Sequence, residues 1–190
     1  MYDLTHTFIT RWSYPSSDAG LVDARMEQIY TRLLYRPSTE DSVAPDWIYE
    51  SCRITALIYC RSIVQGMPLA HSANIMHARS SGANTATTVI SALHHAVEQT
   101  DKERFWGDLG GVFMWVCLVG GAASWSSSQF AFEDLQDTHA PPTAWIRKSF
   151  ALNAIRSSIS DNFYNATANV EAQRTMLEVQ HLIGLRRAIS

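Results

Sequence analysis

Residues 105–124, FWGDLGGVFMWVCLVGGAAS, set the architecture that this chain can adopt. The apolar heart of the stretch, residues 112–119, is rich in β-branched and aromatic side chains, which also suit a buried strand. A lone strand would leave its backbone groups unpaired in the interior, and the chain has no second alternating run to pair with it. A helix pairs these groups locally, so we expect a buried central helix over residues 105–124.

Apolar residues recur at helical spacing on both sides of this stretch. The clearest pattern runs through residues 46–65, where one continuous face includes Ile48, Cys52, Tyr59 and Ile63 and further apolar residues widen the arc. This width indicates a helix contacted by neighbours on more than one side. The pattern predicts further helices over residues 18–35, 85–100, 143–160 and 166–189.

The two C-terminal segments show which face we expect to be buried. In residues 143–160, Trp145 and Phe150 with Ile155 and Ile159 are predicted to face the core, while the basic residues Arg147, Lys148 and Arg156 remain in solvent. In residues 166–189, one side carries the apolar residues Val170, Met176, Leu177, Val179 and Ile183.

These patterns predict an all-α fold. We expect residues 18–190 to form a single bundle-like domain of five to seven helices around the central helix, preceded by an irregular arm over residues 1–17. Polar or Gly- and Pro-containing loops are expected at residues 38–44, 67–84 and 125–142. Gly107 and Gly111, one turn apart, are predicted to let another helix approach closely, as are Gly120 and Gly121.

Composition limits the possible functions. Fifteen Lys and Arg against 18 Asp and Glu give a net charge of −3, so no positive field exists to hold nucleic acid or an anionic membrane. The three cysteines form no Cys-x-x-Cys unit, and the N-terminus has no recognisable secretory signal. We expect an intracellular protein, in the nucleus or cytoplasm.

Residues 109–132 contain no charged side chain and are long enough to span a bilayer. The strongly apolar part covers only residues 112–119, and no basic cluster flanks it. A buried core helix is therefore the favoured interpretation, and an interfacial membrane protein is a weaker alternative.

The residues that carry chemistry do not form a catalytic pattern. A di-iron bundle needs two Glu-x-x-His units, and only Glu178 with His181 has this spacing. His94 and His95 point about 100° apart on a helix, which makes joint metal binding difficult. The chain has no nucleophile-elbow motif and no cysteine signature. We predict no catalytic residues, no metal and no cofactor.

Three stretches together resemble a known family. Residues 47–59, WIYESCRITALIY, residues 93–123, ending in WGDLGGVFMWVCLVGGAA, and residues 176–185 are similar to motifs of the C-terminal regulatory domain of fungal-specific transcription factors of the binuclear zinc cluster class. The resemblance covers about residues 46–187. The cysteine-rich, basic DNA-binding cluster of that class has no counterpart in this chain.

The resemblance implies a non-enzymatic helical domain that regulates transcription by binding a protein or a small molecule, without itself binding DNA. It supplies no catalytic residues. Our candidate ligand-binding residues are His94, Trp106, Asp108 and Trp115. The alternative hypothesis is a small helical ligand-binding protein or enzyme whose pocket lies near Trp106, Trp115 and His94.

Overall fold

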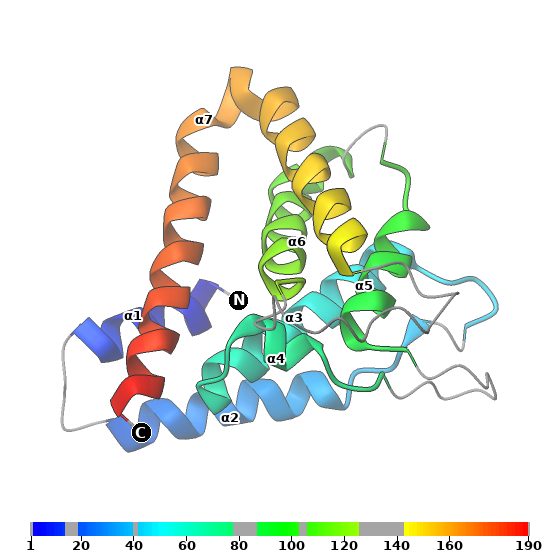
Figure 1. Ribbon diagram of the computed structural model, residues 1–190. Coiled ribbons are helices and arrows are strands. Elements are labelled where there is room, and N and C mark those ends of the chain that lie inside the picture. The colour runs from blue at the N-terminus through cyan, green and yellow to red at the C-terminus, as the bar shows by residue number, and fades with distance from the viewer. Residues whose placement is uncertain are drawn as a thin grey trace.

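The computed structural model describes residues 2–13, 19–39, 42–77, 87–102, 106–125 and 143–189. The elements that these residues form are helices, as the sequence predicts, and their one β feature is an isolated bridge between Met76 and Thr88. The helices are α1 (Tyr2–Ser13), α2 (Ala19–Leu34), α3 (Trp47–Gln65), α4 (Leu69–Ala73), α5 (Val89–Glu98), the 3₁₀ helix η2 (Gly107–Leu109), α6 (Gly110–Ala123) and α7 (Thr143–Ile189) (Figure 1).

Helix α6 lies at the centre of the fold, in contact with α3, α4, α5 and α7 (Figure 1). The side chains of Phe113, Val116, Cys117 and Val119 are fully buried. The predicted central helix is thus confirmed, although its first residues form η2 and a turn instead of α-helix. A helix apolar on nearly every side is stable in water only when neighbours cover it, and four helices do so here.

Only part of the predicted glycine packing is found. A Cβ on Gly120 would lie 2.7 Å from the ring of Phe150 on α7, so this glycine does permit a close approach. A Cβ on Gly107 or on Gly111 would meet nothing within 4 Å, so the prediction for these two is wrong. Gly107 instead has a φ of 58°, a backbone conformation that glycine adopts without steric cost.

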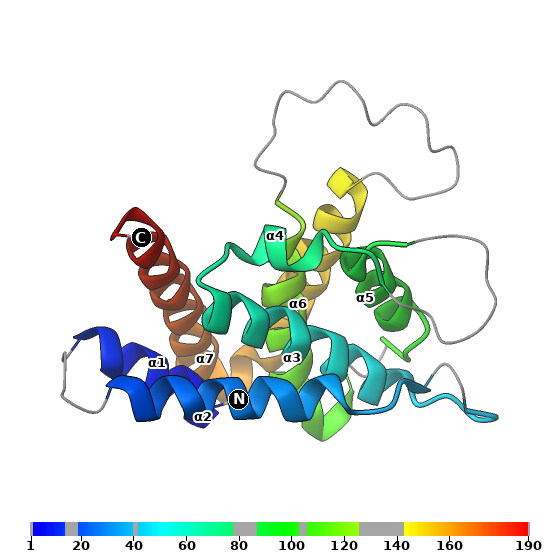
Figure 2. The ribbon, with the colours of Figure 1, turned by 90° about the horizontal axis from the view of Figure 1, so that it is seen from below.

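Helix α3 forms a second layer beside α6, with α2 running along its other side (Figure 2). The Asp46 side chain caps its N-terminus by accepting from the Tyr49 amide, and Gly66 ends it with a φ of 63°. Ile54 and Ile58 are buried as well as Tyr59 and Ile63. The wide apolar arc read from the sequence therefore does contact neighbours on several sides.

The N-terminal residues differ from prediction, because residues 2–13 form helix α1 in place of an irregular arm. Leu4 and Phe8, one turn apart, are fully buried in the common core. The hydroxyls of Thr5 and Tyr59 share a 2.9 Å hydrogen bond that ties α1 to α3. The segment carries only one short apolar stripe, and tertiary packing supplies the stabilisation that so short a helix lacks.

The C-terminal part is one helix, α7, where we expected two helices separated near residues 160–166. The intervening sequence contains Asp161, Asn162 and Asn165, which are weak helix formers, but no Pro or Gly, so nothing in it blocks helical hydrogen bonds. Figure 1 shows α7 bent midway into two arms: the first lies along α6, and the second reaches α1.

The loops contain a further element. Within the predicted loop 67–84, residues Leu69–Ala73 form the short helix α4. Helix α5 begins at Val89 behind the Thr88 cap, later than the predicted start at residue 85. The predicted Asp18 cap, residues 78–86 and most of the predicted loop 125–142 lie outside the described residues.

Candidate functional site

Trp106, the first candidate ligand-binding residue, lies just before η2 and is buried. Its indole Nε1 donates a 3.0 Å hydrogen bond to the Thr100 hydroxyl, and its ring meets Phe113 edge-on at 5.1 Å between centroids. Its φ of 64° is unusual for a residue with a Cβ and costs about 1–3 kcal/mol. Burial of the large ring and its hydrogen bond offset this strain.

The other two rings contact different neighbours. Trp115 is half-buried on α6 and packs edge-on against Tyr59 of α3, at 6.0 Å between centroids. His94 of α5 is buried and meets the Phe150 ring at 5.8 Å. Its Nε2 has no hydrogen-bond partner among the described residues and lies 3.8 Å from Glu98 Oε1. Burial lowers the pKa of His94, against the opposing effect of Glu98.

Asp108, the fourth candidate, is exposed in η2. Among the described interactions, no hydrogen bond or ring contact joins any two of the four candidates. Three of them contribute rings to separate helix contacts, so each has a packing role that does not depend on a ligand. Their assignment to a ligand site stays a prediction.

The cysteines and the potential metal ligands offer no second candidate site among the described residues. Cys60 and Cys117 are buried and Cys52 is half-buried, and none of the three forms a disulfide. Burial raises the pKa of Cys60 and of Cys117 to about 12, which suppresses the reactive thiolate. Among the described residues, no three His, Cys, Asp or Glu side chains gather to hold a metal ion.

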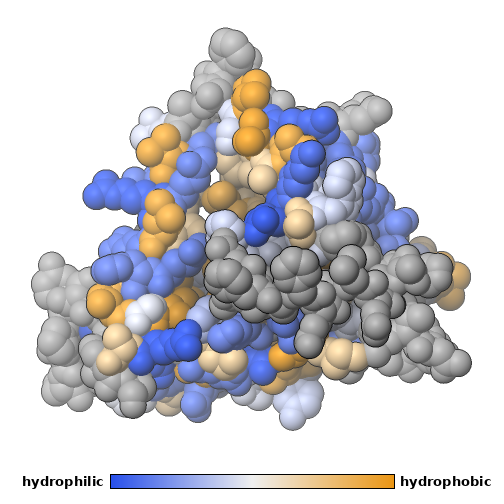
Figure 3. Space-filling view, in the orientation of Figure 1, coloured by the Kyte–Doolittle hydropathy of each residue, from blue (hydrophilic) through white to orange (hydrophobic). Residues whose placement is uncertain are grey.

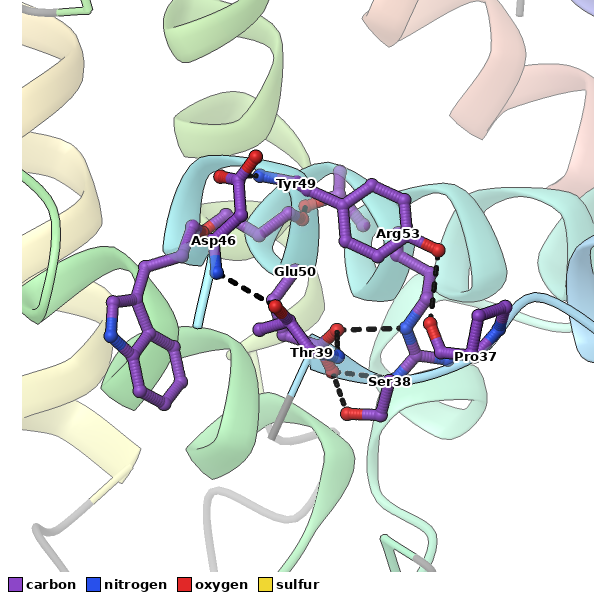
Figure 4. A network of polar contacts seen from close by, with 10 residues as sticks. Pro37, Ser38, Thr39, Asp46, Tyr49, Glu50 and Arg53 are labelled. Atoms are coloured by element: carbon purple, nitrogen blue, oxygen red, sulfur yellow. Dashed lines mark hydrogen bonds and ion pairs between the residues drawn. The ribbon is translucent and has the colours of Figure 1, made fainter. Parts of the chain in front are cut away.

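A buried carboxylate joins the loop after α2 to helix α3 (Figure 4). Glu50 is fully buried and accepts hydrogen bonds from the Arg53 guanidinium at 2.6 and 2.9 Å. It also accepts from the Ser38 hydroxyl at 2.9 Å and the Thr39 amide at 3.1 Å. These four hydrogen bonds satisfy both carboxylate oxygens of Glu50 from within the chain, so the network joins two segments of the fold and does not need a ligand.

Burial by itself raises the pKa of Glu50, but Arg53, Thr39 and Ser38 together outweigh it and hold the pKa below its ordinary value. Glu50 is therefore ionised at neutral pH and is unsuited to act as a general acid or base. The Tyr49 hydroxyl donates to the Pro37 carbonyl at 2.9 Å and covers the same loop.

The first arm of α7 presents a surface that the sequence interpretation missed. Its buried side is formed by Ile146, Phe150, Asn153 and Ser157. Trp145, Leu152, Ile155 and Ile159 point outward instead, with exposed fractions from 42% for Leu152 to 63% for Ile159. The prediction that Trp145, Ile155 and Ile159 face the core is therefore wrong, whereas Lys148 and Arg156 are exposed as expected. We call Trp145, Lys148, Leu152, Ile155 and Ile159 the outer face of α7.

Contact with α6 explains this orientation. The Phe150 ring fits over Gly120, and this fit sets the rotation of the arm about its axis. Two polar residues, Asn153 and Ser157, are carried inward with Phe150, and the richer apolar line is left in solvent. Both faces of this arm carry apolar residues at helical spacing, so the periodicity alone does not predict which face is buried. The heptad-like spacing of the outer face was the one feature of the sequence that indicated a helix-binding surface.

The second arm of α7 is also only partly as predicted. Met176, Val179 and Ile183 are buried, but Val170 and Leu177 are exposed. Figure 3 shows apolar side chains at the surface along both arms. Single exposed apolar residues are common in proteins, whereas an aligned set on one helix is typical of an interaction surface.

Comparisons with known proteins add no family to this description. No family model matches the chain, and no curated protein or solved structure shows significant similarity to it. None of the described helices is both long enough and apolar enough to cross a membrane.

Proposed function

We propose that this chain is a non-enzymatic helical regulatory domain that acts in transcription by binding another protein. The observation that carries the proposal is the outer face of α7, on which Trp145, Leu152, Ile155 and Ile159 are exposed in one line. Full burial of an exposed aliphatic side chain gains about 1.5–3 kcal/mol, and these side chains, 42–63% exposed, can gain about half of that each against a partner. Tryptophan is, in addition, among the residues that most often dominate binding energy at protein interfaces.

Two further features support a binding role over catalysis. The resemblance of residues 47–59 and 93–123 to the regulatory domain of fungal transcription factors implies the transcriptional setting and work in the nucleus. The aromatic rings within those stretches pack against other helices, with Trp115 on Tyr59 and Trp106 on Phe113. The aromatic residues of the stretches that carry the resemblance thus build the scaffold, whereas the apolar side chains of the outer face of α7 are exposed and within reach of a partner.

A reporter assay tests the proposal. The full chain is fused to a heterologous DNA-binding module, and expression of a reporter downstream of that module's site is measured. We expect the fusion to raise or lower reporter expression, and the double variant Leu152→Asp, Ile155→Asp to abolish this effect. A wild-type fusion that reaches the nucleus and leaves the reporter unchanged contradicts the proposed function.

Leu21→Asp is the matched control. Leu21 lies on α2 and is 76% exposed, so this variant places a carboxylate on an exposed leucine of a different helix. It should keep the wild-type reporter effect. Thermal unfolding of all variants, followed by circular dichroism, verifies that loss of the effect does not result from loss of the fold.

A further inference from the structure

The outer face of α7 combines its apolar line with a local excess of positive charge. Residues 143–159 contain Arg147, Lys148 and Arg156 and no Asp or Glu, although the whole chain has a net charge of −3. Lys148 lies within the apolar line, between Trp145 and Leu152 at i, i+3 and i+7, and Arg156 borders it. The face is therefore apolar along its middle and basic in and beside it.

The three cations are not equivalent. The guanidinium of Arg147 stacks over the Trp125 ring at the end of α6, 4.4 Å from its centroid, and is half-buried there. Lys148 and Arg156 are exposed, and no carboxylate of the described residues pairs with either of them. Their charge is thus available to an incoming group, in the way that complementary charges beside an apolar centre select a partner.

The spacing of the apolar residues indicates the shape of that partner. Trp145, Leu152, Ile155 and Ile159 stand at i, i+7, i+10 and i+14, which is the seam along which one helix packs against another. Such a seam binds the apolar side of an amphipathic helix.

We propose that the outer face of α7 binds an acidic amphipathic helix of another protein, with the partner's apolar residues on the seam and its Asp or Glu residues beside Lys148 and Arg156. This inference rests on the proposed function and specifies its partner.

Charge disfavours a second copy of this chain as the occupant. In an antiparallel pairing of two outer faces about Leu152, Lys148 of one copy would face Arg156 of the other, because both lie four residues from Leu152. Like charges at this position cost binding energy. An anionic membrane would match the charge, but the narrow seam with Lys148 inside it fits a helix better than a broad lipid surface.

Binding of designed peptides tests the proposal. The acidic probe is a labelled amphipathic helix with leucines at the seam spacing and glutamates beside them, and the matched basic probe has lysine in place of each glutamate. Fluorescence anisotropy is measured with the full chain at low and at high salt. We expect the acidic probe to bind at least about tenfold more tightly than the basic probe, with the difference shrinking at high salt.

Variants of the chain assign the binding to this face. The double variant Lys148→Glu, Arg156→Glu should reverse the preference, so that the basic probe binds more tightly. Leu152→Asp with Ile155→Asp should abolish binding of both probes, and Leu21→Asp should leave it unchanged. Equal binding of the two probes, no binding, or a preference that survives the charge reversal overturns the proposal.

Two controls detect the other occupants. Light scattering that shows a dimer disrupted by Leu152→Asp, or pelleting of the chain with phosphatidylserine vesicles that depends on Lys148 and Arg156, also overturns the proposal. Failure of the partner chemistry is distinguishable from failure of the proposed function. If the reporter effect depends on Leu152 and Ile155 while the probes show no charge preference, the regulatory function stands and the acidic partner does not.

Discussion

The ring of Phe150 lies directly over Gly120, so close that a single methyl group at Gly120 would reach to 2.7 Å from the ring carbons. This contact joins α6 to the first arm of α7 at a point where both residues are buried. It fixes which side of α7 faces inward. Because Phe150 is directed to α6, Trp145, Leu152 and Ile155 are directed to solvent.

Gly120→Ala should destabilise the protein, because the added methyl group must displace a fully buried ring. Overpacking of this kind costs about 1–3 kcal/mol in the free energy of unfolding. Urea unfolding followed by circular dichroism measures it. Gly111→Ala, whose methyl group meets nothing within 4 Å, is the matched control and should be neutral or stabilising by up to about 1 kcal/mol. Equal effects of the two substitutions would show that the Phe150 contact is not limiting.

Arg186 docks the second arm of α7 onto the end of α3. Its guanidinium donates hydrogen bonds to the carbonyls of Ile63 at 2.9 Å and Val64 at 3.3 Å. Hydrogen bonds from a charged donor contribute about 1.5–3 kcal/mol, so Arg186→Ala should lower stability by about that amount. The neighbouring Arg187 is exposed, and Arg187→Ala should change stability by less than about 0.5 kcal/mol. Similar losses for both variants in urea unfolding would contradict a specific docking role.

Glu50 should make the free energy of unfolding decrease at acidic pH. Its pKa in the fold is below the ordinary value of 4.5, so its contribution is complete above that pH and is lost as pH falls through the lower pKa of the folded state. Glu50→Gln removes this dependence. It should also destabilise the neutral protein by about 3 kcal/mol, since Arg53 loses its ionised partner.

Urea midpoints measured at a series of pH values from neutral into acid check this expectation. Glu27→Gln, at an exposed position of α2, is the control and should follow the wild-type curve. A Glu50→Gln variant whose stability declines in acid as steeply as that of the wild type would contradict the assignment.

His94 should act in the same direction at higher pH. Burial lowers its pKa in the fold below the ordinary 6.5, so the unfolded chain takes up the proton first. Its effect on stability is absent above pH 6.5 and becomes a loss as pH falls below that value. His94→Gln should therefore flatten the decline in melting temperature between pH 7 and pH 5 relative to the wild type. Identical pH profiles for the variant and the wild type would contradict this.

Among the candidate site residues, the sequence could identify large aromatic side chains but not the residues that each of them contacts. The sequence predicts Trp106 and Trp115 as candidate ligand-binding residues, and in the structure each packs against another ring. Trp106 contacts Phe113 of α6, and Trp115 contacts Tyr59 of α3. These contacts depend on how the helices are placed in space, which an apolar stripe does not specify. The ionic tie of Glu50 to Ser38 and Thr39 likewise depends on how the loop after α2 returns to α3.

The order of residues along the chain was enough to predict the all-α class, the buried stretch around Phe113 and Val116, and a helix over residues 46–65, close to the observed bounds of α3. These features depend on local hydrogen bonding and on periodicity, both of which are written along the chain. Helix α1 and the rotation of α7 were decided only by tertiary contacts. Leu4 and Phe8 stabilise α1 by packing into a core that distant segments form. Phe150 packs over Gly120 and leaves a more apolar face of α7 exposed, because close packing depends on shape as well as on hydrophobicity.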